Sequence, residues 1–177
     1  VSRGLGDVYK RQLSNILGAE GIGLYQMIFA LYSLALVVAG GAVPTSMAIT
    51  IAKMRASGKG SIKKVFFKYF FISAGLGTLF FLIFLLFAPN IASLQGNSLA
   101  TTGYRYISFA VLFSSLIAPF RGLFQGYENM TPTAVSQLIE QTLKLALGLG
   151  LSYAFLCLGI EMAVSGAIIG VAVSELI

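Results

Sequence analysis

Long apolar runs are the feature that most constrains how this chain can fold. Four of them have the length of about 20 residues that an α-helix needs to cross the hydrocarbon core of a bilayer, and the fifth is shorter. Of all residues 57% are hydrophobic and 10% are charged, whereas about a quarter of the residues of a soluble domain are charged. Because a bilayer offers no hydrogen bonds to the backbone, we expect an all-α, polytopic membrane helix bundle. The runs lie near residues 24–52, 66–88, 104–124, 133–158 and 162–177.

The first residues of the chain call for separate treatment. Residues 2–12 read Ser-Arg-Gly-Leu-Gly-Asp-Val-Tyr-Lys-Arg-Gln, and this string resembles a transposase sequencing adapter translated in frame. We therefore expect residues 1–12 to be an adapter-derived artefact that is disordered and takes no part in the fold. Residues 13–177 would then form a partial transmembrane lobe, and we expect this lobe to be an internal fragment of a longer membrane protein.

Positive charge is concentrated between the first two apolar runs. Residues 53–68 contain six lysines and arginines and no acidic residue. Because lysine and arginine are enriched in the cytoplasmic loops of membrane proteins, we predict that the loop 53–68 is cytoplasmic. Its position between two spans argues against nucleic acid as a partner and favours contact with anionic lipid headgroups. Alternation of the spans then puts residues 125–131 on the inside as well, and residues 13–23, 90–103 and 159–161 on the outside.

A proline interrupts the first apolar run. Residues 40–46 read Gly-Gly-Ala-Val-Pro-Thr-Ser. Pro44 cannot donate a backbone hydrogen bond and collides with the preceding turn, so we predict that the helix kinks or breaks there. Two interpretations stay open, because the kink could serve helix packing alone or Pro44 could be a functional hinge.

Polar side chains follow one face of the fourth run. At about 100° per residue, five of them fall within an arc of about 100° and extend over about half the thickness of the hydrocarbon core. Charges at such a depth usually face a cavity or a partner, so we predict a polar wall of a cavity that opens to the cytoplasm. These five residues are Thr133, Gln137, Glu140, Gln141 and Lys144.

The candidate substrate-binding residues come from this face and from the end of the third run. They are Arg121, Gln137, Glu140, Gln141 and Lys144. A second interpretation is open for each group. Arg121 could instead reach the cytoplasmic headgroups. Glu140 and Lys144, four residues apart, could neutralise each other while the two glutamines join helices.

The chain lacks the residues of common catalytic and metal sites. It contains no histidine and a single cysteine, Cys157. It also has neither a phosphate-binding Walker loop nor a dinucleotide-binding fingerprint. We therefore predict that the chain is not an enzyme, and we expect neither a cofactor nor a metal ion.

Two longer motifs resemble a known family. Gly18–Phe29 and Phe120–Gln141 are similar to the corresponding segments of stage V sporulation protein B-like proteins. These proteins belong to the polysaccharide-transporter branch of the multidrug/oligosaccharidyl-lipid/polysaccharide flippase superfamily. The resemblance covers essentially all of residues 13–177. It implies that this chain is most of the N-terminal lobe of a two-lobed transporter in the bacterial cytoplasmic membrane, and that a C-terminal lobe is missing from it.

The resemblance also implies a function. Members of the family are associated with moving polyprenyl-linked cell-envelope precursors by alternating access, so the expected partner is a lipid-linked oligosaccharide or peptidoglycan precursor. Lys144 or Arg121 would suit its pyrophosphate, while Gln137 and Gln141 would suit sugar hydroxyls. One alternative is a cation-coupled multidrug antiporter of the same superfamily, which would favour a buried acid without a neighbouring cation. Another is a membrane scaffold that transports nothing.

Overall fold

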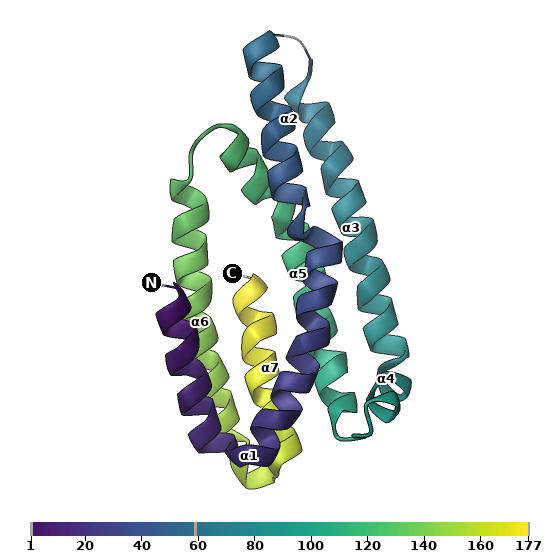
Figure 1. The fold of residues 1–177 in the computed structure, drawn as a ribbon, viewed down its shortest axis with the longest axis vertical. Helices are drawn as coiled ribbons and strands as arrows, with labels where there is room; N and C mark the ends of the chain where they lie inside the picture. The colour runs from purple at the N-terminus through teal and green to yellow at the C-terminus, as the bar shows by residue number, and fades with distance from the viewer. Residues whose placement is uncertain (1, 59, 177) are drawn as a thin grey trace.

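The computed structural model describes residues 2–58 and 60–176, with side chains for Gln12, Leu13 and the described residues from Asn15 onward (Figure 1). This part of the chain is built from helices and contains no strand, in agreement with the predicted all-α bundle. In chain order the elements are α1 (Ser2–Leu36), a π-helical turn (Val37–Gly41), α2 (Val43–Ser57), α3 (Ile62–Leu86), α4 (Ala88–Leu94), α5 (Ala100–Gly126), α6 (Thr131–Ala154), a 3₁₀ turn (Leu156–Leu158) and α7 (Ile160–Leu176).

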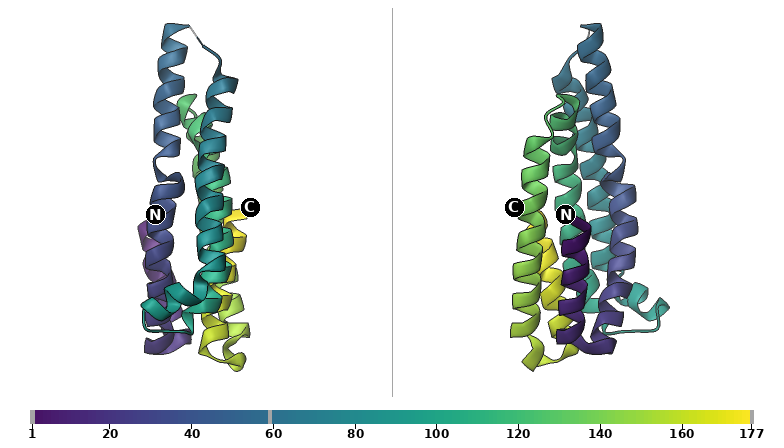
Figure 2. Two further views of the ribbon diagram at one scale, coloured as in Figure 1. Left: turned by 90° about the vertical axis from the view of Figure 1, so that its right-hand side faces the viewer. Right: turned by 60° about the vertical axis from the view of Figure 1, so that its left-hand side comes forward.

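Helix α1 turns back on itself at Gly18. The backbone of Gly18 has φ 69° and ψ −173°, and a positive φ carries no steric penalty for a residue without a Cβ atom. Figures 1 and 2 show that the residues before Gly18 run toward one end of the bundle and the residues after it run back. Residues 2–12 are part of this helix, which differs from the expectation that they are disordered. Val1 lies outside the described residues, and the adapter origin stays a prediction.

The interruption predicted at Pro44 involves the residues just before it. Val37–Gly41 form the π-helical turn, and α2 starts at Val43, so Pro44 lies in the first turn of α2. Proline fits this position because the first N–H groups of a helix have no acceptor within the helix. Turns of this kind often mark functional sites, but the role of Pro44 as a hinge stays a prediction.

Three stretches of the described chain are long and apolar enough to cross a membrane: Asn15–Ser57, Ile62–Leu86 and Ala100–Gly126. The first and third stretches contain the first and third predicted runs. The second stretch largely coincides with the second run. The fourth run is shorter than predicted, because α6 ends at Ala154 and a 3₁₀ turn follows. Helix α6 has 24 residues, but it is not among these stretches because the polar side chains along one face lower its hydrophobicity. Helix α7 has 17 residues and is not among these three stretches.

The helix ends group at the two ends of the bundle as alternation requires. Figure 1 shows the end of α2, the start of α3 and the connection from α5 to α6 in its upper part. The turn within α1, helix α4 and the connection from α6 to α7 lie at the opposite end (Figures 1 and 2). The grouping therefore agrees with the predicted alternation of loops. Which end faces the cytoplasm stays a prediction.

Helix α5 holds the bundle together through close contacts with its neighbours. A Cβ atom added at Gly77 of α3 would lie 1.7 Å from Ser115 Oγ, and one added at Gly122 would lie 2.9 Å from Pro44 Cα. Glycines at these two positions let the helices approach closely. Ser73 Oγ, buried in the same contact, donates a hydrogen bond to the Ser115 carbonyl at 2.6 Å. The packing fixes α5, and with it Arg121, against α2 and α3.

Candidate functional site

A carboxylate on α6 binds two cations from two helices. Arg121 Nη2 on α5 lies 2.6 Å from Glu140 Oε2, and Lys144 Nζ lies 3.3 Å from Glu140 Oε1. Lys144 is one turn further along α6 than Glu140, which is the favourable order for an i, i+4 ion pair. The pairing of Glu140 with Lys144, which the sequence left open, is therefore present, and Arg121 joins it.

Two residues that the sequence analysis did not single out extend this network. Lys144 Nζ lies 3.7 Å from Glu175 Oε1 on α7, and the Tyr32 hydroxyl on α1 donates a hydrogen bond to the same oxygen at 3.0 Å. Glu175 could have been found from the sequence, since it is an acid within the apolar fifth run, where charges are rare. Nothing in the pattern around Tyr32 indicated its role. We call Arg121, Glu140, Lys144, Glu175 and Tyr32 the charge network.

The charge network is buried in the middle of four helices. The side chains of Glu140 and Glu175 are 9% and 4% exposed, and those of Lys144 and Arg121 are 15% and 21% exposed. Removing charges from water costs several kcal/mol per ion unless partners compensate them. Two cations and two anions lie together here, so the network is neutral as a whole. This balance allows it to exist inside an apolar bundle.

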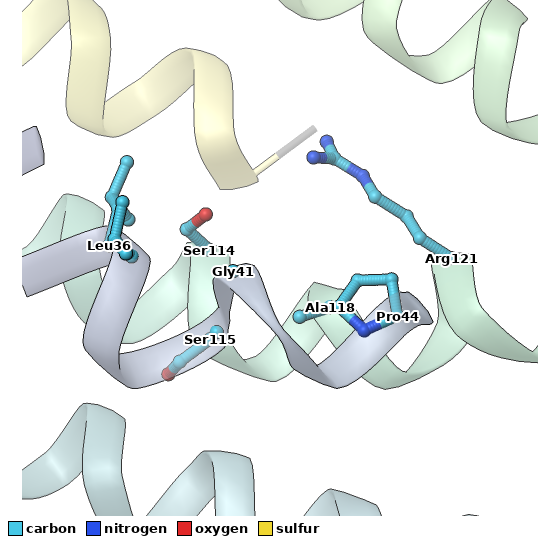
Figure 3. A pocket seen from close by; sticks show the side chains of 9 residues that line it. Leu36, Gly41, Pro44, Ser114, Ser115, Ala118 and Arg121 are labelled. Atoms are coloured by element: carbon cyan, nitrogen blue, oxygen red, sulfur yellow. The ribbon is translucent and has the colours of Figure 1, made fainter. Parts of the chain in front are cut away.

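Arg121 also borders a hollow between α2 and α5. The hollow has a volume of about 230 Å³ and is lined by the π-helical turn, by Pro44 and by three small residues of α5, Ser114, Ser115 and Ala118. Figure 3 shows the Arg121 side chain extending away from α5 over this hollow, with the Ser114 hydroxyl on the same side and the Ser115 hydroxyl turned away. Arg121 Nε is buried and has no hydrogen-bond partner within the described residues. This guanidinium therefore keeps one donor that the described chain does not use.

The polar face of α6 divides into an inner and an outer part. Thr133 and Glu140 are buried and Lys144 is largely buried, whereas Gln141 is half-buried and Gln137 is exposed. The structure therefore brings Arg121, Glu140 and Lys144 together and leaves the two glutamines outside their contacts. Whether these residues bind substrate stays a prediction.

Comparison with known proteins identifies the family. The pattern of the family described as polysaccharide biosynthesis protein matches residues 1–177, the whole chain. This chain belongs to that family. Membership in the polysaccharide biosynthesis protein family confirms the predicted relation to polysaccharide transporters. Its match also extends over residues 1–12.

Relatives from Bacillus subtilis (strain 168) agree with this membership. Stage V sporulation protein B is 31% identical over 99% of this chain and 34% of its own length. The lipid II flippase MurJ is 30% identical over 82% of this chain and 28% of its own length. The uncharacterized membrane protein YabM is 29% identical over 94% of this chain. The chain thus spans about a third of the length of these relatives. No solved structure matches it significantly.

The relatives and the apolar helices give the same location. The three stretches that can cross a membrane, together with relatives that are membrane proteins, make this member of the polysaccharide biosynthesis protein family a multi-pass bacterial membrane protein.

Proposed function

We propose that this chain is part of a flippase that moves a polyprenyl-linked cell-envelope saccharide precursor across the bacterial cytoplasmic membrane. The observation that carries the proposal is the position of Arg121, a cation among apolar helices that borders a hollow and has an unused donor. Such residues in membrane helices are costly and usually serve a substrate pathway. The printed name of one relative, lipid II flippase, supports a lipid-linked substrate.

Arg121 is the group that we propose for the phosphates of the substrate. A guanidinium is planar and carries five N–H donors, so one edge can stay on a carboxylate while another binds a phosphate. Here Nη2 binds Glu140, and Nε faces no partner in the described chain. Glu140 thus orients Arg121, and phosphate oxygens would use the remaining donors. The Ser114 hydroxyl, on the same side of α5, is a further donor for the substrate.

Gln137 and Gln141 are proposed to contact the sugar. Both carry an amide that donates and accepts hydrogen bonds, which suits hydroxyl groups. Gln137 is exposed and Gln141 is half-buried, so both could meet a large polar group, or a second lobe that faces it. The polyprenyl tail would remain in the lipid beside the bundle.

Alternating access is the proposed mechanism. It requires two bodies that move against each other around a site at mid-membrane depth. We propose that this chain supplies one body, and that a C-terminal lobe of the same protein supplies the other. The π-helical turn before Pro44 borders the hollow, so bending there would change the wall that faces Arg121. Pro44 is therefore our candidate for the hinge.

The charge network argues against the main alternative. A multidrug antiporter that carries organic cations needs an acid that a cation can reach. Glu140 is already bound by Arg121 and Lys144, and Glu175 by Lys144 and Tyr32. A membrane scaffold differs from both transporters because it moves nothing.

Complementation of a flippase-deficient bacterial strain tests the proposal. The complete gene product that contains this chain should restore growth, and its Arg121→Gln variant should not when expression is adjusted so that both are present in the membrane at equal levels. Growth without the protein should stay impaired. Efflux of ethidium from the same cells should not change. Ethidium efflux without complementation would support the multidrug antiporter, and neither activity would support a scaffold; both outcomes contradict the proposal.

A further inference from the structure

The two carboxylates of the charge network differ in the number of cations that pair with them. Glu140 has Arg121 at 2.6 Å on one oxygen and Lys144 at 3.3 Å on the other. The one cation that pairs with Glu175 in the described chain is Lys144, at 3.7 Å. Glu140 would keep a short ion pair without Lys144, whereas Glu175 would keep none.

Because the side chain of Glu175 is buried, its dependence on a single cation affects the stability of the protein. The side chain of Glu175 is 4% exposed, so water cannot replace a missing counter-ion, and its Oε2 has no hydrogen-bond partner within the described residues. Tyr32 donates to Oε1, but a hydroxyl carries no compensating charge. A buried carboxylate that loses its cation is strongly destabilising. Lys144 can therefore not move to a substrate without leaving Glu175 uncompensated.

We propose that Lys144 is the internal counter-ion of Glu175, and that Glu175, fixed by Tyr32, is a positioning residue. Glu175 holds Lys144 on the α7 side, and Lys144 in turn fixes Oε1 of Glu140, whose Oε2 orients Arg121. Tyr32, Arg121, Glu140 and Glu175 come from α1, α5, α6 and α7, so the network ties four helices into one body. Lys144 therefore balances the charge of Glu175 and does not bind the substrate. Only the consequence for Arg121 rests on the proposed function.

Charge balance makes the proposal testable by a double-variant cycle. In the complete gene product, Lys144→Met and Glu175→Gln should each lower the thermal unfolding midpoint by several degrees, because each leaves one buried charge uncompensated. The double variant Lys144→Met/Glu175→Gln removes one charge of each sign and should recover most of the loss. Lys144→Arg, which keeps the charge, should lose less than Lys144→Met.

Glu161 provides a matched control on the same helix. It accepts a hydrogen bond from Thr102 at 2.7 Å and lies 14 positions before Glu175, about 21 Å away along α7. Lys144→Met/Glu161→Gln should therefore show no recovery. If Lys144→Met is too unstable to purify, the two double variants can be compared directly. More folded Lys144→Met/Glu175→Gln than folded Lys144→Met/Glu161→Gln should then be extracted from membranes. Additive losses in Lys144→Met/Glu175→Gln, or equal recovery in the control, would refute the pairing.

A binding measurement separates a positioning role from loss of stability. The probe is a fluorescent polyprenyl pyrophosphate that carries one sugar, with inorganic pyrophosphate and unphosphorylated polyprenol as competitors. Lys144→Met should weaken binding at a temperature where the protein is folded, and the second change Glu175→Gln should recover at least half of that loss. A double variant that binds as weakly as Lys144→Met would show that Lys144 itself holds the substrate and would overturn the proposal. If the wild type binds no probe, the proposed function fails, and the unfolding cycle still decides the counter-ion assignment.

Discussion

At the scale of single residues, the compensation of buried charges decides whether the charge network can exist inside an apolar bundle. Glu140 is the carboxylate that two cations share, so its removal should unbalance the site most directly. Glu140→Gln would leave Arg121 without an ion pair and Lys144 with Glu175 alone. Because Arg121 is 21% exposed and can partly rehydrate, we expect a loss toward the lower end of the ~3–5 kcal/mol reported for broken buried pairs.

The measurement is the free energy of unfolding of the purified complete protein. Glu128→Gln is the control, because Glu128 is an exposed acid just after α5 and its loss should change stability by less than about 0.5 kcal/mol. Equal stabilities of Glu140→Gln and Glu128→Gln would show that the shared carboxylate contributes nothing to the fold.

A second residue-scale prediction concerns close packing. Gly77→Ala should destabilise the bundle by about 1–3 kcal/mol, because its methyl group would overlap Ser115 at 1.7 Å from Oγ and 2.5 Å from Cβ. Gly75→Ala on the same helix meets nothing within 4 Å and should be neutral or slightly stabilising. Thermal unfolding of the two variants side by side checks this prediction, and a similar midpoint for both would be inconsistent with the α3–α5 contact.

At the scale of elements, the π-helical turn and Pro44 form the break that we propose as a hinge. Pro44→Ala should leave stability nearly unchanged, because a residue in the first turn of a helix adds no essential backbone hydrogen bond. Transport should nevertheless slow several-fold if the interruption between α1 and α2 serves movement. Both are measured on one preparation, as the unfolding midpoint and the translocation rate. An unchanged rate would leave Pro44 with a packing role only.

The helices could be predicted more completely than the site. Runs of apolar residues marked the three membrane stretches, because hydrophobicity and length decide which segments enter a bilayer. The turn at Gly18 and the short helix α4 left no comparable signal. The sequence placed Glu140 and Lys144 on one face through helical periodicity. It could not pair them with Arg121, Glu175 and Tyr32, because tertiary packing decides which helices meet.

At the scale of the whole molecule, the orientation of the bundle can be tested by labelling. Ser61 and Ser98 are exposed and lie beside opposite ends of the bundle, Ser61 before α3 and Ser98 before α5. In a Cys157→Ser background, a cysteine at residue 98 should react with a membrane-impermeant maleimide on intact cells, and one at residue 61 only after lysis. The reverse pattern would invert the predicted topology and place the basic loop 53–68 outside.

The central claim is that the complete protein translocates a polyprenyl-linked saccharide through a site that contains Arg121. The most direct measurement is the rate at which reconstituted protein moves a fluorescent polyprenyl-pyrophosphate sugar across proteoliposomes, followed by quenching from outside. We predict a rate well above that of protein-free vesicles. Arg121→Gln also unbalances the charge network, so the two proteins are compared at equal amounts of folded protein. At equal amounts it should lower the rate at least about tenfold, the effect of ~1.4 kcal/mol. A rate for wild type that equals the protein-free rate, or an equal rate for folded Arg121→Gln, would contradict the account.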